Sequence, residues 1–135
     1  MTTSYLDSNV FIHPVLFVDA KADRCRAILR RVVAGELTAV TSVLTWDEFV
    51  YVVQKVLGRK VAVAEGQKFL RFPHLSFLKA DMGILMRAQR LLTEYNVRPR
   101  DALHAATALA CGADDVISDD SDFDAIKDIR RIPVM

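Results

Sequence analysis

The chain is 135 residues long, the usual size of one domain, and we expect residues 1–135 to form a single domain. Hydrophobic residues make up 52% of the sequence, which argues against disorder. The 18 basic and 17 acidic residues leave a net charge of +1, so overall charge marks neither a nucleic-acid binder nor a membrane binder.

Cysteine spacing and the length of the apolar runs set further limits. Cys25 and Cys111 form no metal-binding spacing, which excludes a disulfide framework and argues against a zinc site. No apolar run reaches the roughly 18 residues that span a bilayer, and the N-terminus lacks the pattern of a secretory signal. We therefore expect a cytoplasmic protein with no membrane partner.

Segments with helical and strand-like patterns alternate along the chain. Apolar residues at helical spacing predict helices over residues 22–33, 45–57, 60–71, 82–95 and 101–111. Short apolar or β-branched runs predict strands at residues 5–6, 37–41, 75–78, 115–118 and 132–134. This alternation is typical of an α/β fold, here a three-layer α/β/α sandwich around a central, mostly parallel sheet.

Acidic residues follow two of the predicted strands. In open parallel sheets, ligands bind beyond the carboxyl ends of the strands, where the strand order reverses. Asp7 comes directly after the first strand. Four aspartates within six residues follow the strand at 115–118, namely Asp119, Asp120, Asp122 and Asp124. Taken singly, Asp7 has an ordinary explanation as a helix N-cap, and Glu48 and Asp101 as acids near helix N-termini.

Bringing several of these carboxylates together requires a counter-charge. Two like charges about 4 Å apart repel by about 1 kcal/mol in water and by several times that near a protein surface. A pocket that joined Asp7, Asp101 and one of the later aspartates would therefore destabilise the fold unless a cation bound there. Ligand sets made of oxygen alone suit Mg²⁺ or Mn²⁺.

Four short blocks carry a family pattern. They are Tyr5-Leu6-Asp7-Ser8-Asn9-Val10, Thr45-Trp46-Asp47-Glu48-Phe49, Arg100-Asp101-Ala102-Leu103-His104-Ala105-Ala106 and Val116-Ile117-Ser118-Asp119-Asp120-Ser121-Asp122-Phe123. In this order, each at a strand or helix boundary, they resemble the motifs of the PIN domain family. That family comprises small metal-dependent nucleases, many of them toxins of VapBC-type toxin–antitoxin pairs. The resemblance covers essentially the whole chain and implies a PIN-like fold.

The resemblance also implies roles for individual residues. It implies five catalytic acids, which are Asp7, Glu48, Asp101, Asp120 and Asp122. It implies that four of them, Asp7, Asp101, Asp120 and Asp122, are ligands of Mg²⁺ or Mn²⁺. Asn9 and Ser118 match residues that support the site.

The motifs leave the roles of three further residues open, namely Asp119, Asp47 and His104. Asp120 falls on the first D of the family's [ST]-x-D-x-D-F motif, so we prefer it to the adjacent Asp119. Asp47 lies beside Glu48 and leaves a similar one-residue ambiguity. His104 also matches the family, but a histidine three residues after an aspartate on a helix more often packs or bonds locally, and we expect that here.

The implied function is that of a metal-dependent endoribonuclease, acting as the toxin of a toxin–antitoxin pair. Its partners would be an RNA substrate, an antitoxin protein and a second copy of the chain in a homodimer. Arg98 and Arg100 flank Asp101 and are the best candidates to contact RNA phosphates. We expect the metal, rather than a protein cation, to offset the charge of the acids.

Two other functions stay open from the sequence. One is a PIN-like domain that binds RNA or protein without catalysis; its signature would be the loss of an acid, yet every expected acid is present. The other is a phosphatase of the haloacid dehalogenase type, which has a similar first motif. Here Asn9 stands where that chemistry uses a second acid.

Overall fold

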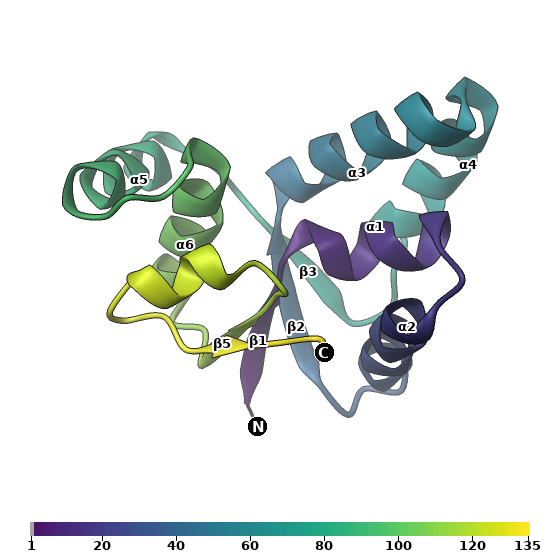
Figure 1. Cartoon of the computed structure of the whole chain (residues 1–135), viewed down its shortest axis with the longest axis horizontal. Helices are drawn as coiled ribbons and strands as arrows, with labels where there is room; N and C mark the ends of the chain where they lie inside the picture. Colours follow the sequence, from purple (N-terminus) through teal and green to yellow (C-terminus); the bar gives the residue numbers. More distant parts are fainter. Residues whose placement is uncertain (1) are drawn as a thin grey trace.

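A parallel sheet of five strands lies at the centre of the computed structural model, which describes residues 2–135 (Figure 1). The strands are β1 (Thr3–Leu6), β2 (Thr38–Ser42), β3 (Leu75–Leu78), β4 (Asp115–Ile117) and β5 (Arg131–Ile132). Their order in the sheet is β3-β2-β1-β4-β5, and every neighbouring pair is parallel. The predicted strands are thus present. The last one is displaced from 132–134 because Pro133 has no N–H and the N–H of Val134 bonds to a side chain instead.

Six α-helices and one 3₁₀ helix surround this sheet in residues 2–135. They are α1 (Ser8–Leu16), α2 (Ala20–Val33), α3 (Val43–Leu57), α4 (Arg59–Leu70), α5 (Met82–Glu94), α6 (Pro99–Cys111) and the 3₁₀ helix η1 (Ser121–Ala125). The five predicted helices are confirmed within a few residues. Within the described residues, no helix combines the length and apolar character that crossing a membrane requires.

The helix α1 does not appear among the predicted helices, for two reasons visible in its sequence. Pro14 lies inside it, and its residues are apolar on most sides rather than along one stripe. Val10 and Phe11 are buried in the core, so packing rather than an amphipathic pattern stabilises this helix. Asp7 caps its N-terminus by accepting a hydrogen bond from the backbone N–H of Ser8.

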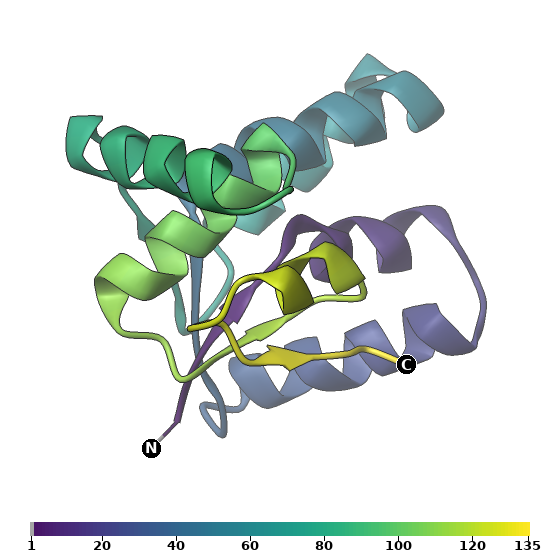
Figure 2. The same cartoon turned by 60° about the vertical axis from the view of Figure 1, so that its left-hand side comes forward.

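Alternating side chains on the strands divide the core into two layers. Leu6, Ala39 and Ile117 point into one apolar cluster, which is completed by residues of α1, α2, α3 and α4. Their neighbours Tyr5 and Val116 point into the other cluster, with residues of α5 and α6. Figure 1 shows α5 and α6 on one side of the sheet and α1–α4 on the other, and Figure 2 shows α1 and α2 apart from α5 and α6. The predicted α/β/α sandwich is therefore confirmed.

The strand order reverses between β1 and β4. The chain first adds β2 and β3 on one side of β1, and then places β4 and β5 on the other side. Leu6 pairs with Ile117 across this junction, and the N–H of Asp7 bonds to the carbonyl of Ile117 at 3.1 Å. The residues that follow these two strands, Asp7 and Ser118, are therefore neighbours at the edge where ligands bind in such sheets.

Candidate functional site

A pocket of about 590 Å³ lies at this edge of the sheet. Its walls come from the β1–α1 junction, α3, the start of α6 and the loop after β4. The lining residues are Asp7, Ser8, Asn9, Glu48, Arg98, Pro99, Arg100, Asp101, His104 and Asp120. Four of the five acids predicted as catalytic line the pocket, and the fifth, Asp122, lies beside two of them.

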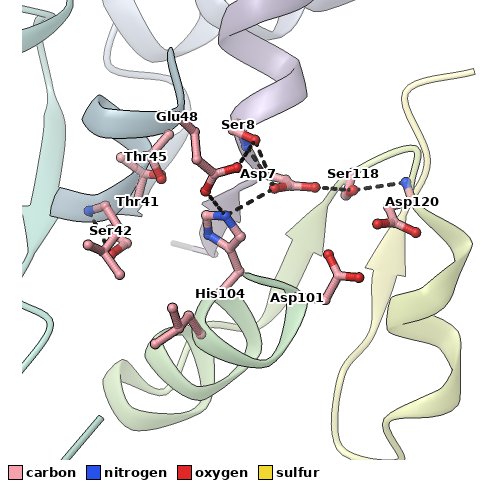
Figure 3. A network of polar contacts seen from close by, with 12 residues as sticks. Asp7, Ser8, Thr41, Ser42, Thr45, Glu48, Asp101, His104, Ser118 and Asp120 are labelled. Carbon is pink, nitrogen blue, oxygen red and sulfur yellow. Dashed lines mark hydrogen bonds and ion pairs between the residues drawn. The ribbon is translucent and has the colours of Figure 1, made fainter. Parts of the chain in front are cut away.

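Asp7 is held from both sides by the fold (Figure 3). Its Oδ1 accepts a hydrogen bond from the N–H of Ser8 at 2.7 Å, and its Oδ2 accepts one from the hydroxyl of Ser118 at 2.6 Å. The residue is only 6% exposed. The ordinary explanation of Asp7 as a helix cap is thus right, and the same carboxylate also faces the pocket.

Glu48 is the sixth residue of α3 and does not cap that helix. Ser42 is the cap, because its Oγ accepts a hydrogen bond from the N–H of Leu44. The carboxylate of Glu48 instead points toward α6 and the start of α1, as Figure 3 shows. Its Oε1 accepts from Nε2 of His104 at 2.6 Å, and its Oε2 accepts from the hydroxyl of Ser8 at 3.0 Å.

Three further carboxylates form an outer group, Asp101, Asp120 and Asp122. Each offers an oxygen atom that lies within 4.8 Å of the others. Arg98 reaches all three, at 3.2 Å from Asp101, 2.7 Å from Asp120 and 3.7 Å from Asp122. The expectation that no protein cation offsets the acids was therefore wrong. The side chain of Arg98 is 70% exposed, so this counter-charge lies at the mouth of the pocket.

The other two aspartates of the cluster face away from the pocket. Asp119 accepts hydrogen bonds from the N–H groups of Val134 and Met135 and forms an ion pair with Lys21 at 2.9 Å. Asp124 pairs with Arg131. Asp119 therefore anchors the C-terminal segment, whereas the adjacent Asp120 faces the pocket.

The remaining predicted residues lie around the pocket. Ser118 lies behind Asp7, and its Oγ also accepts a hydrogen bond from the N–H of Asp120 at 2.9 Å. Arg100 is exposed at the rim. Asp47 is exposed and lines a smaller neighbouring cavity rather than this pocket.

Asp101, Glu48 and His104, which line the pocket, have shifted pKa values. Burial and the nearby charge of Asp120 raise the pKa of Asp101 to about 6, even though Arg98 opposes the shift. Burial alone would raise the pKa of Glu48, but the hydrogen bond and charge of His104 hold it below its usual value. Burial alone would lower the pKa of His104, yet its bond to Glu48 and the charge of Asp7 raise it.

The residues present fit a hard divalent cation. The outer group supplies three carboxylate oxygens close together, and such oxygens are the ligands that Mg²⁺ and Mn²⁺ prefer. Asn9 lines the same pocket, and its buried Oδ1 has no hydrogen-bond partner within residues 2–135. Asp7 lines the pocket as well but does not belong to the closely spaced group of three.

Two polar residues of this region were not among the predicted site residues. Ser8 bonds to Glu48, and Tyr5 bonds to His104 from inside the core. The signal for Tyr5 is a phenol hydroxyl at a position predicted to be buried, since a buried hydroxyl requires a partner. His104 was expected to pack or to bond locally. It is indeed buried, but its two ring nitrogens bond to residues of β1 and α3 rather than to its own helix.

Comparison with known proteins identifies one family and several solved structures with a similar fold. The sequence model of the PIN domain matches residues 4–129. Among solved structures, the chain is similar to a DNA-bound VapBC of Salmonella typhimurium, with 21% identity, a TM-score of 0.78 and 100% of each chain covered. It is also similar to VapBC2 of Rickettsia felis bound to a promoter DNA fragment, with 19% identity, a TM-score of 0.76 and 98% of each chain covered.

A third similar structure is VapC20 of Mycobacterium tuberculosis, described as a toxin that cleaves the sarcin–ricin loop. Its identity is 17% and its TM-score is 0.72, over 94% of this chain and 98% of that one. Among curated protein sequences, none matches the chain. At these identities the structural likeness establishes the fold, and the sequence match establishes the family.

Proposed function

Because the chain belongs to the PIN domain family, we propose that it is a Mg²⁺- or Mn²⁺-dependent endoribonuclease that hydrolyses phosphodiester bonds in RNA. The observation that carries this proposal is the convergence of four acids on one pocket, from the β1–α1 junction, α3, α6 and the loop after β4, with Asp122 beside two of them. Such a group of carboxylates is stable only with compensating positive charge. The need for that charge makes the pocket suited to a divalent cation and to the phosphate that it would bind.

In this proposal, Asp101, Asp120 and Asp122 hold the cation, with Asp7 as a further ligand. The ion supplies charge neutralisation at the phosphate and a hydrolytic water of lowered pKa. Glu48 orients the water, because hydrogen bonds at both of its oxygens fix its carboxylate. Ser118 keeps Asp7 in place through its 2.6 Å bond.

The two arginines at the mouth are proposed to contact the RNA backbone. Arg98 and Arg100 both line the pocket and are both exposed. Arg98 lies closer to the acids and therefore closer to the phosphate that is cleaved. Contacts of this kind carry no base specificity, so they predict affinity that falls with salt rather than a sequence preference.

We further propose that the protein is the toxin of a toxin–antitoxin pair. Support comes from the similar solved structures, which include VapBC complexes of two bacteria. The outer face of α3 and α4 offers a surface for an antitoxin or a second copy of the chain, because it exposes Tyr51, Val56, Val63 and Leu70. Light scattering of the wild type and of Tyr51→Glu tests for a homodimer through this face.

Neither alternative function has a supporting observation in the pocket. A domain that only binds RNA would not require all five acids to converge. A phosphatase of the haloacid dehalogenase type would require an acid at position 9, where Asn9 lies at the pocket wall.

The proposal is tested by incubating the purified protein with mixed RNAs in Mg²⁺, in Mn²⁺ and in EDTA. We expect internal cleavage in both metals and none in EDTA. Asp101→Asn is the inactive control. Asp119→Asn is the matched control, because it removes a neighbouring carboxylate that faces away from the pocket and leaves the carboxylates of the pocket unchanged. RNA binding without turnover in either metal would favour the non-catalytic function, and cleavage of a small phosphate ester without RNA cleavage would favour the phosphatase.

A further inference from the structure

A chain of buried hydrogen bonds lies behind the pocket. The hydroxyl of Tyr5 is 2.5 Å from Nδ1 of His104, and Nε2 of His104 is 2.6 Å from Oε1 of Glu48. Tyr5 is fully buried and His104 is 2% exposed. Placing two polar side chains in the core is costly unless each polar atom finds a partner, and here the partners form a line that ends at a pocket carboxylate.

The chemistry of the partners indicates which atoms donate in this chain of bonds. An ionised carboxylate only accepts hydrogen bonds, so Nε2 of His104 is the donor toward Glu48. A phenol is protonated at neutral pH, so the hydroxyl of Tyr5 carries a proton that it can donate. The Tyr5 hydroxyl can therefore donate to Nδ1, which keeps the ring in the form that donates from Nε2.

The contacts of His104 orient Glu48 relative to Asp7. The ring is bonded at both nitrogens, and it meets the ring of Tyr5 edge-on, with centroids 5.6 Å apart. Its Nε2 also lies 3.6 Å from Oδ1 of Asp7. The second oxygen of Glu48 is bonded by Ser8, whose own N–H bonds to Asp7. A single imidazole thus lies between the two inner carboxylates of the pocket.

We propose that His104 is a positioning residue for RNA cleavage: Nε2 holds Glu48 in the orientation required for reaction, and Tyr5 holds the ring through Nδ1. This inference rests on the proposed function and extends it. His104 acts through Glu48 and has no direct contact with RNA. A displacement of about 1 Å in a reacting or orienting group can cost about 100-fold in rate, so the loss of this bond has a measurable cost.

The test uses two amide substitutions that mimic different ring nitrogens. The amide of Gln in His104→Gln reaches the place of Nε2 and can still donate to Glu48. The shorter Asn in His104→Asn reaches the place of Nδ1 and can bond only toward Tyr5. We expect His104→Asn to lower kcat about 100-fold with little change in KM for RNA, and His104→Gln to retain kcat within about tenfold of the wild type.

Thermal unfolding of both variants separates positioning from stability. A merely structural histidine would lower Tm in both variants and reduce their activity equally, which would overturn the proposal. If neither variant folds, Tyr5→Phe replaces them, because it keeps the bond to Glu48 but frees Nδ1. A several-fold lower kcat at unchanged KM would then support positioning, and an unchanged kcat would contradict it.

A structural measurement tests the positioning role of His104 independently of the proposed nuclease activity. Crystal structures of the two variants show where the carboxylate of Glu48 points, whether or not the wild type cleaves RNA. We expect Glu48 to stay in place in His104→Gln and to turn away in His104→Asn. An unmoved Glu48 in His104→Asn would refute the positioning role even if the nuclease activity is real.

Discussion

The two sides of the pocket hold their carboxylates by different means. On the inner side, Asp7 and Glu48 each accept hydrogen bonds at both oxygens from nearby side chains or backbone N–H groups (Figure 3). On the outer side, Asp101, Asp120 and Asp122 share one ion-pair partner, the exposed guanidinium of Arg98, and Asp120 also accepts a hydrogen bond from the backbone N–H of Asp122.

This difference indicates that the two sides of the pocket have different roles. Donors that are largely buried hold the inner carboxylates in one orientation, which is the property required for positioning a reactant. The outer carboxylates depend on a charge at the protein surface, which a dissolved cation can replace. A change at Glu48 should therefore affect the reaction first, and changes on the outer side should affect metal binding first.

The largest effect is expected for Asp101→Asn. It removes an outer ligand, so we expect cleavage to fall at least about 1,000-fold and Mg²⁺ affinity to fall at least about tenfold. The fold should remain, because the amide keeps the shape of the side chain. Cleavage assays and calorimetric Mg²⁺ titration on one preparation check both effects. Mg²⁺-dependent cleavage at the wild-type rate would remove Asp101 from the site.

Glu48→Gln tests the inner side. We expect a loss of about 100-fold in kcat, because the amide cannot accept at both of its terminal atoms as the carboxylate does. Mg²⁺ affinity should stay within about threefold of the wild type, since Glu48 lies outside the outer group. If Mg²⁺ affinity fell as far as in Asp101→Asn, the distinction between the two sides would be lost.

Metal binding should weaken in acid because of Asp101. Its pKa is raised to about 6, so the carboxylate gains a proton as the pH falls through about 6 and then competes with the cation. Mg²⁺ binding below this pH should release protons, which calorimetry in buffers of different ionisation enthalpy measures. An affinity that is constant from about pH 5 to about pH 7.5 would contradict this role for Asp101.

The same shift affects the stability of the metal-free protein. A carboxyl group with a raised folded-state pKa favours folding at low pH, and this contribution is lost as the pH rises through the folded-state value. Asp101→Asn should therefore match the wild type near about pH 4 and be more stable by about 1 kcal/mol above about pH 6 in EDTA. Urea unfolding at the two pH values measures this difference.

A smaller effect is expected for Arg98→Gln, with Arg98→Lys as its charge-conserving control. Without the guanidinium, the outer carboxylates lack their protein counter-charge, so Mg²⁺ affinity should increase about threefold. RNA should bind more weakly and with a shallower dependence on salt, because a phosphate contact is lost. An unchanged Mg²⁺ affinity would indicate that Arg98 does not compete with the cation for the outer carboxylates.

The smallest effect on activity is expected for Asp119→Asn. This carboxylate bonds to the C-terminal segment and to Lys21, away from the pocket. Cleavage should stay within about twofold of the wild type, whereas the free energy of unfolding should fall by about 1 kcal/mol. A loss of activity comparable to that of Asp101→Asn would show that the two adjacent aspartates had been assigned to the wrong sides.

Much of the fold follows from local patterns in the sequence. The apolar stripes of α2 and α5 and the short strands each carry a clear period, and the alternation of strands and helices predicts the parallel sheet. The helix α1 lacks such a pattern because it is buried on several sides. Its stability comes from contacts with residues distant in the sequence, which local periodicity does not record.

The acids of the site could be chosen from the motifs, but not their partners. Apart from the family motif, nothing local distinguishes Asp119 from Asp120, since both follow β4. Their orientation depends on the C-terminal segment, which bonds to Asp119. The contacts of Arg98 and His104 depend on how α6 lies against α3 and the loop after β4. The sequence pattern brings these elements to one edge but does not fix side-chain contacts between them.

The central claim is that the outer carboxylates bind a divalent cation, and anomalous scattering from crystals grown with Mn²⁺ tests it most directly. The account predicts a Mn²⁺ peak in the pocket within coordination distance, about 2.0–2.2 Å, of oxygens of Asp101 and Asp120, with the guanidinium of Arg98 displaced from them. A pocket without a peak at saturating Mn²⁺, with Arg98 still bonded to both carboxylates, would contradict it.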